Sequence, residues 1–343
     1  VTSTVILYKA LKHIGANVIY YIPDREEEGY GLNISAINEV IKKGVDIIFT
    51  CDNGIASIEE VKYIKENNID IIILDHHEPR FLEEDNDKIE ILPNADVIIN
   101  PKQLNCKYKF KALSAGGISY KFVQGLYNYM EIEENLEEYL VFASISTVCD
   151  IVDLLDENRL IVKMGLDIFN NNKQINKGLF EILKVNNIDE KIISETDYGF
   201  IIGPCINASG RLESALKAVE LFTEDNEENI KKLAVELLNL NIERKELTYR
   251  AVEDIFHMIE NSSIKNDKVL VVYNDKIHES IAGIVAGRIK EAYYKPTFVI
   301  TKSKDGAKGS GRSIPSYNMF EEILKCSDLL QKFGGHKMAA GLS

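Results

Sequence analysis

The sequence predicts an α/β protein in which a parallel-sheet domain is joined by a long helix to a smaller α/β domain. The first half alternates short apolar runs with amphipathic stretches, a polar segment free of Gly and Pro follows, and apolar runs then resume. At 343 residues and 45% hydrophobic, the chain is long enough for two cores. We expect the sheet domain at 1–215, the connecting helix at 216–262 and the second domain at 263–343.

Three apolar runs in the first half are expected to be strands. They are ANVIYYIPD (16–24), GVDIIFTCDNG (44–54) and NIDIIILDHHE (68–78), with helical patterns between them. In each of the last two runs an aspartate, Asp52 or Asp75, comes just after the apolar residues. Ligands bind at the carboxyl ends of parallel strands, so we expect Asp52 and the cluster Asp75 to His77 to lie along one crevice.

A mostly helical region follows Ala112. FASISTVCDIVDL places Asp150 after a helical stretch of small residues. From Asp225 to Asn261 the chain has no Gly or Pro, and Asp225 with Glu228 suggests a capping pair. At 1.5 Å per residue this helix would be about 50 Å long, which is typical of a connection between domains.

The charge is uneven along the chain. The net charge is -14, yet 263–343 holds 13 Lys and Arg against 8 Asp and Glu, so this segment is +5 and the remainder is -19. A basic segment favours contact with phosphate, whereas the whole-chain average argues against nucleic acid.

The composition predicts a cytoplasmic protein without a membrane segment. No apolar run approaches the roughly 20 residues of a spanning helix, and no signal-peptide pattern is present. The five cysteines have no CxxC spacing, which suits a reducing compartment. The chain begins inside a helical pattern and stops just after GGHKMAAGLS, so we expect an excised piece of a longer protein.

A mixed set of carboxylates and imidazoles is the main candidate for chemistry. Carboxylates suit hard divalent cations, and imidazole shifts the preference toward Mn²⁺ or a similar ion. Two such ions about 4 Å apart can activate water in phosphodiester cleavage. A lone Asp is more often a turn or cap, and a lone His a surface residue. Adjacent histidines after an aspartate and an apolar strand favour the metal site, whose candidates are Asp52, Asp75, His76, His77 and Asp150.

Two glycine-rich basic segments could bind anions. AKGSGRSIPS (307–316) offers the Ser310 hydroxyl, the Gly311 backbone and the Arg312 guanidinium, or it forms a hairpin turn with a solvated Arg. FGGHKMAAG (333–341) places Gly335 before His336, and by itself it suggests a glycine turn that leads into a helix. Their occurrence together in one basic domain favours anion binding.

Two further segments carry an arginine. INASGRLESA holds Asn207 and Arg211, and Arg211 either reaches the cleft or caps the next helix. GIVAGRIK places Arg288 on a helix, where a solvated side chain is the ordinary outcome.

Six motifs occur in the order found in the DHH phosphoesterases, and the chain most resembles RecJ-type single-stranded-DNA exonucleases. These motifs are TCDNGI, ILDHHEP, STVCDIVDL, INASGRL, GSGRSIP and GGHKMAAG. The resemblance implies a DHH domain and a DHH-associated nucleic-acid-binding domain facing it across a cleft. It also implies Mn²⁺- or Mg²⁺-dependent hydrolysis of single-stranded DNA from the 5′ end to mononucleotides, in recombination and repair.

The resemblance assigns roles to individual residues. Asp52, His76 and Asp150 look like metal ligands, His77 like a residue that faces the scissile phosphate, and Asp75 like the group that orients the histidines. The remaining candidates resemble groups that bind nucleic-acid phosphates, and they are Asn207, Arg211, Arg288, Ser310, Gly311, Arg312, Gly335 and His336.

The sequence departs from the family at both ends. The family's first motif, a strand with closely spaced aspartates that ligate the metals, should lie immediately before Val1, and the OB domain that follows in RecJ proteins is absent. We therefore expect weak or no activity from this fragment. Two alternatives stay open, a small-nucleotide phosphodiesterase of the same family and an inactive nucleic-acid-binding scaffold. Protein partners in replication or repair are not identifiable from the sequence.

Overall fold

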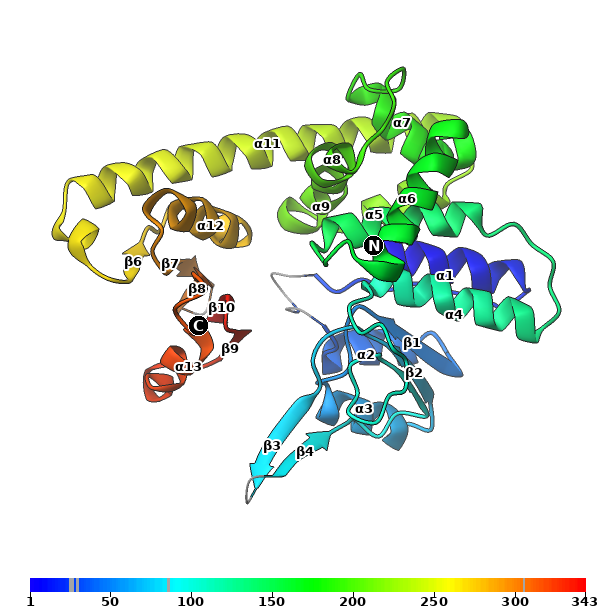
Figure 1. Ribbon diagram of the computed structural model, residues 1–343, viewed down its shortest axis with the longest axis horizontal. Helices are drawn as coiled ribbons and strands as arrows, with labels where there is room; N and C mark the ends of the chain where they lie inside the picture. Colours follow the sequence, from blue (N-terminus) through cyan, green and yellow to red (C-terminus); the bar gives the residue numbers. More distant parts are fainter. Residues whose placement is uncertain (25–27, 29–30, 85–86, 305) are drawn as a thin grey trace. The chain divides into compact units, whose positions relative to one another are not determined.

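The computed structural model of the chain describes residues 1–24, 28, 31–84, 87–304 and 306–343 (Figure 1). It separates into two compact units, Val1–Asn239 and Leu240–Ser343, and the division lies inside the long helix α11 (Glu227–Glu260). The predicted fold class is confirmed, since one unit holds a parallel sheet and the other a second, separate sheet.

The sheet of the first unit is parallel and has the order β1-β2-β5. Its strands are β1 (Ile47–Cys51), β2 (Asp70–Leu74) and β5 (Val97–Ile99). In the register, Cys51 lies opposite Leu74, and Leu74 lies opposite Ile99. The three strands therefore end at the same height in the sheet. The residues that follow each strand in sequence lie together at this carboxyl-terminal edge.

Helices cover both faces of this sheet. Helices α2 (Ile34–Ile41) and α3 (Ile58–Glu66) share a core with Ile71 and Ile73 of β2. The opposite face carries Phe49, whose ring centroid lies 5.7 Å from that of Phe122 on α4. Burial on both faces explains the unbroken apolar runs of these strands.

The rest of the first unit is a helical layer around α5. Its core residues include Tyr198, Phe142, Phe169 and Phe222, all fully buried. A Cβ at Gly165 would lie 2.3 Å from Ser144 Oγ, so this glycine permits the close approach of α6 to α5. The helices are α1 (Thr2–His13), α4 (Ala115–Tyr129), α5 (Glu137–Cys149), α6 (Asp156–Asn171), α7 (Lys177–Val185), α8 (Glu195–Asp197), α9 (Gly203–Leu212) and α10 (Leu216–Thr223), and a short hairpin is formed by β3 (Arg80–Glu84) and β4 (Asp87–Ile91).

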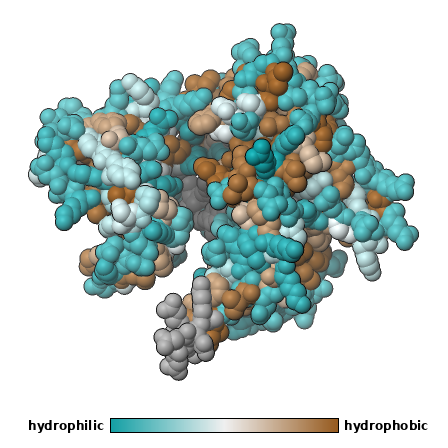
Figure 2. Space-filling model, in the orientation of Figure 1, coloured by the Kyte–Doolittle hydropathy of each residue, from teal (hydrophilic) through white to brown (hydrophobic). Residues whose placement is uncertain are grey.

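The second unit is built on a five-stranded mixed sheet with the order β6-β7-β8-β10-β9. One end of α11 contributes Ala251, Ile255 and Ile259 to its core. On the face seen in Figure 2, hydrophilic residues cover most of this unit, whereas hydrophobic residues gather near the middle of the first unit. Its elements are β6 (Leu270–Tyr273), α12 (Ala282–Tyr293), β7 (Thr297–Ser303), β8 (Gly306–Arg312), α13 (Met319–Leu324), β9 (Phe333–His336) and β10 (Ala339–Leu342).

Four local predictions were wrong. Residues 16–24 form no strand, and in the described part of the chain no backbone hydrogen bond joins 17–23 to β1. The side chain that caps α11 belongs to Asn226, whose Oδ1 accepts from the N–H groups of Glu228 and Asn229 at 3.0 Å each.

The two glycine-rich segments of the second unit contain strands, in place of the hairpin turn considered for the first and the turn and helix expected for the second. Gly306–Arg312 is β8, a central strand of the sheet, and Phe333–His336 pairs with Ala339–Leu342 as a hairpin in place of a turn and helix. Glycine suits β8 because a Cβ at Gly311 would lie 2.4 Å from Met319 Sδ. In the described residues, no helix is long and apolar enough to cross a membrane.

Candidate metal site

Three chain segments meet at the level edge of the parallel sheet. Asp52 directly follows β1, Asp75 to His77 directly follow β2, and Asp150 is the C-cap residue of α5. Asp52 takes a left-handed backbone conformation with φ 67°, which is uncommon outside glycine and common at functional turns. The strand ends therefore turn acidic and imidazole groups toward one another.

His76 lies between two carboxylates. Its Nε2 is 3.2 Å from Asp52 Oδ1, and its Nδ1 is 3.3 Å from Asp150 Oδ2. The His76 side chain is 11% exposed, whereas those of Asp52 and Asp150 are 46% and 36% exposed. Both ring nitrogens thus face acidic oxygens at an opening to solvent.

Asp75 is the buried support of the two histidines and is 1% exposed. Its Oδ1 accepts from the backbone N–H groups of His76 and His77 and lies 2.7 Å from His77 Nδ1, while its Oδ2 accepts from the Ile55 N–H. Burial by itself would raise the pKa of Asp75, but these bonds and the His77 charge hold that pKa below its ordinary value. The same hydrogen bond raises the pKa of His77.

The donor set fits a divalent cation. One ligand atom from each of Asp52, His76 and His77 lies within 4.8 Å of the others. Burial raises the pKa of Asp150, because a carboxylate that loses water is costly to ionise. A cation would relieve that cost, and carboxylates with imidazole suit Mn²⁺.

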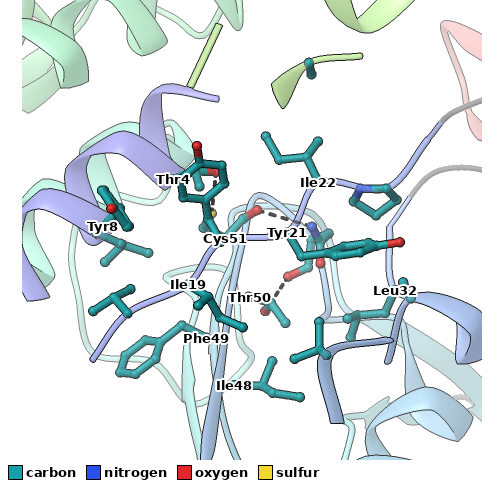
Figure 3. Close-up of a pocket in the computed structure, with 18 of the residues that line it drawn as sticks. Thr4, Tyr8, Ile19, Tyr21, Ile22, Leu32, Ile48, Phe49, Thr50 and Cys51 are labelled. Atoms are coloured by element: carbon teal, nitrogen blue, oxygen red, sulfur yellow. Dashed lines mark hydrogen bonds between the residues drawn. The ribbon is translucent and has the colours of Figure 1, made fainter. Parts of the chain in front are cut away.

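An apolar pocket of about 640 Å³ opens between β1 and residues 16–24. Figure 3 shows side chains from both segments around this pocket, Ile19, Tyr21 and Ile22 from 16–24 and Ile48, Phe49 and Cys51 from β1. Among the described strands β1 has a neighbour on one side only, β2. The pocket thus runs along the unpaired edge of the sheet.

The polar end of this pocket adjoins the candidate metal site. Asp52, Asn53 and Asn207 all line it. The buried Oδ1 of Asn53 has no hydrogen-bond partner among the described residues. A buried polar atom without a hydrogen-bond partner costs free energy. We therefore expect a further polar group to bind at this end of the pocket and supply the missing hydrogen bond.

The residues predicted to bind phosphates fall in both units. In the first unit, α9 carries Asn207, which is exposed, and Arg211, which is partly buried. In the second unit, Arg288 is exposed on α12. The other five lie on two strands of the second sheet that are separated by β10, with Ser310, Gly311 and Arg312 on β8 and Gly335 and His336 on β9.

Arg312 lies against a face of α12 formed by Gly283 and Gly287, two residues that were not among the predicted site residues. A Cβ at Gly283 would be 2.7 Å from Arg312 Nη2, whereas a Cβ at Gly287 would be 4.0 Å from Arg312 Cγ. The guanidinium donates from Nη1 to the Gly311 carbonyl oxygen at 2.8 Å, and burial lowers its pKa. The signal in the sequence was the spacing of the two glycines in GIVAG, which matches one helix face.

Gly283→Ala is expected to displace the Arg312 guanidinium. The phosphate binding predicted for Arg312 should then weaken by about tenfold, the loss of one charge-assisted contact. The measurement is fluorescence anisotropy with a labelled oligonucleotide in chelator. Gly287→Ala is the matched control on the same helix face, because its Cβ meets only ordinary contact. Equal affinities for the two variants would contradict the prediction.

Two family models match the chain. Residues 1–147 match the model described as DHH family, N-terminal domain, and residues 266–343 match the DHHA1 domain.

Curated relatives match along all of this chain. The single-stranded-DNA-specific exonuclease RecJ of Bacillus subtilis is 37% identical over 345 residues, and that of Salmonella typhimurium is 33% identical over 361 residues. Each alignment covers 100% of this chain but only 42% and 61% of those proteins. The chain therefore spans about half the length of the curated relatives it matches.

Solved structures agree with these relatives. A crystal structure of exonuclease RecJ bound to manganese aligns with a TM-score of 0.83 at 28% identity, over 100% of this chain and 82% of that one. RecJ from Thermus thermophilus in complex with Mn²⁺ aligns with a TM-score of 0.82 at 27% identity, over 100% of this chain and 47% of that one.

Proposed function

We propose that this chain, in which residues 1–147 match the DHH family, N-terminal domain, and residues 266–343 match the DHHA1 domain, is the core of a single-stranded-DNA exonuclease of the DHH family. The reaction is metal-dependent hydrolysis from the 5′ end that releases mononucleotides, in recombination and repair. The cluster of Asp52, His76, His77 and Asp150 at the sheet edge carries this proposal. The similarity to RecJ of Bacillus subtilis along all of the chain supports the choice of substrate.

Asp52, His76 and Asp150 would hold the cation, and Mn²⁺ is the ion we propose, with Mg²⁺ as a substitute. Similar RecJ structures are described in complex with Mn²⁺ and with Mg²⁺. A divalent ion would supply activation of water and neutralisation of charge on the phosphate. Upstream aspartates, which the family resemblance implies, would complete the set for two ions.

Asp75 and His77 would work as a pair, joined by the hydrogen bond between Asp75 Oδ1 and His77 Nδ1. The His77 side chain is 47% exposed, and its Nδ1 lies 2.7 Å from Asp75 Oδ1. Because that contact raises the pKa of His77, the ring keeps its proton to higher pH and presents a positive donor to a phosphate oxygen. Asp75 therefore positions His77 and does not itself meet the substrate.

The phosphates of the strand would be bound by the eight residues to which the resemblance gives this role, which are Asn207, Arg211, Arg288, Ser310, Gly311, Arg312, Gly335 and His336. The net charge of +5 in 263–343 supports this assignment, since phosphate contacts supply most of the affinity for nucleic acid. We propose a cytoplasmic location, as expected for an enzyme of DNA repair without disulfides.

The test is digestion of single-stranded DNA by the chain extended upstream of Val1 through the aspartate-bearing strand that the resemblance implies. Substrates are blocked at the 5′ or the 3′ end, and Mn²⁺ is compared with chelator. We expect mononucleotides only from an open 5′ end and only with the ion. Survival of long strands while dinucleotides are cut would replace this proposal with a small-nucleotide phosphodiesterase.

A further inference from the structure

A second pocket, of about 300 Å³, opens beside His76 within the first unit. It lies between the loop that follows β5 and the turn that follows α5. Its volume is at the lower end of the range for small-ligand sites, which suits one nucleotide and not a longer segment. The residues that give it chemical character are His76, Lys102, Lys111, Leu113, Ile151 and Asp153.

The pocket has two cationic groups against one carboxylate, Asp153. Lys102 Nζ lies 3.3 Å from Glu78 Oε1, and the Glu78 side chain is 71% exposed, so this pair is weakly held. Lys111 Nζ donates to the Cys106 carbonyl oxygen at 2.7 Å. An ammonium has three donors, so each lysine keeps donors for a phosphate.

Lys102 is fixed relative to the histidines. Its backbone N–H donates to Asn100 Oδ1 at 2.8 Å, and Asn100 Nδ2 donates to the His77 carbonyl oxygen at 2.8 Å. Asn100 is 2% exposed, so this link is shielded from water. The buried amide therefore couples the position of one pocket lysine to the chain segment that bears the metal-ligand candidates.

The apolar wall of the pocket includes a residue in an unfavourable conformation. Ile151 has a left-handed backbone with φ 56° and is 90% exposed. A β-branched residue rarely adopts this conformation, and burial of the side chain does not compensate for it here. The turn is held by the hydrogen bond from the Ile151 N–H to the Val148 carbonyl oxygen at 3.2 Å. An apolar contact with a ligand would account for an isoleucine at this position.

We propose that this pocket binds the nucleotide unit next to the scissile phosphate, with Lys102 and Lys111 on its phosphate and Ile151 against its base or sugar. The inference rests on the proposed function, because it takes the substrate of that site to be a DNA strand. The pocket adds a subsite to the metal cluster, which by itself contacts only the reacting phosphate. The released mononucleotide is then also a ligand of the pocket.

The first test measures binding of dTMP to the present chain in chelator by NMR chemical-shift titration. Lys102→Gln and Lys111→Gln are expected to weaken the affinity by about fivefold to tenfold each, whereas Lys107→Gln is the matched control. Lys107 is exposed on the same loop and does not line the pocket. If all three variants bind dTMP like the unmodified chain, or the unmodified chain does not bind it, the proposal is overturned.

A second variant separates binding from folding. Ile151→Gly removes the backbone strain, so we expect the Tm to rise by about 2 °C while dTMP binding weakens by about threefold. A rise in Tm with unchanged dTMP affinity would show that Ile151 makes no contact with the nucleotide and would remove it from the subsite.

The same lysine variants in the upstream-extended chain distinguish this proposal from the proposed function. We expect the KM for single-stranded DNA to rise while kcat stays within about twofold, because the lysines bind and do not react. An active nuclease that is indifferent to both substitutions overturns the subsite and leaves the function standing. An inactive extended chain that still binds dTMP through the two lysines supports the subsite and contradicts the exonuclease.

Discussion

In the upstream-extended chain, His76→Ala is expected to lower Mn²⁺-dependent hydrolysis of single-stranded DNA by about a thousandfold. His76 lies 3.2 Å from Asp52 and 3.3 Å from Asp150, so its loss removes the imidazole that stands between the two carboxylates. A bound ion stabilises the charge on the reacting phosphate by several kcal/mol, and about 4 kcal/mol corresponds to this factor. The rate of mononucleotide release at saturating DNA is the measurement.

The matched control is His257→Ala, since His257 is exposed on α11 in the second unit. It should keep the activity of the unmodified chain. Mn²⁺ affinity, measured by calorimetry on the same proteins, should fall only in His76→Ala. Full activity in His76→Ala would remove this residue from the metal site, and reduced activity with unchanged Mn²⁺ affinity would give it another role.

Asp75→Asn is expected to reduce turnover by about 10-fold to 100-fold and to destabilise the first unit by about 3 kcal/mol. Asp75 is 1% exposed and accepts hydrogen bonds from three backbone N–H groups. The amide that replaces one carboxylate oxygen is a donor, so it faces another donor in a site closed to water. Turnover on single-stranded DNA and chemical unfolding provide the two readouts.

The pH dependence of the free energy of unfolding distinguishes the contribution of the Asp75 charge from that of its packing. The pKa of Asp75 is held below 3.8, so the stability from its ionisation is present above that value and is lost as pH falls through the folded pKa. The pKa of His77 is raised above 6.5, mainly by the Asp75 hydrogen bond, so its contribution is present below 6.5 and is lost as pH rises through the folded pKa. The stability difference between the unmodified chain and Asp75→Asn, measured in chelator, should therefore be larger at about pH 5.5 than at about pH 8.5. A difference that does not change over this range would assign the effect to packing.

The larger features of the fold were predictable from local patterns. The long helix was expected at about 225–261 and occupies Glu227–Glu260, because a run without Gly or Pro is a strong helical signal. The strands β1 and β2 were expected from their apolar runs, and parallel pairing then requires Asp52 and Asp75 to share an edge. These predictions needed only neighbouring residues and a general rule of sheet topology.

The wrong secondary-structure predictions concern segments whose conformation depends on residues that are distant in the sequence. Residues 16–24 have the pattern of a strand but no strand beside them, since the pocket lies between them and β1. The glycines of β8 suggested a hairpin turn as one alternative, whereas Gly311 lies within a strand and provides room for Met319 and Phe298 in the core of the second unit. Neither the missing partner strand nor the packing at Gly311 can be predicted from residues adjacent in the sequence.

The sequence by itself determined which side chains stand at the candidate site, since an aspartate and two histidines that follow a buried strand give the sheet edge carboxylate and imidazole groups. It also determined the uneven distribution of charge, which composition alone reveals. Only the tertiary structure decided that Asp150 reaches His76, that Gly283 makes room for Arg312, and that Lys102 and Lys111 flank a pocket beside the cluster. The physical reason is that local propensity acts over a few residues, whereas these contacts join residues 9 to 74 positions apart whose approach is set by packing of the whole unit.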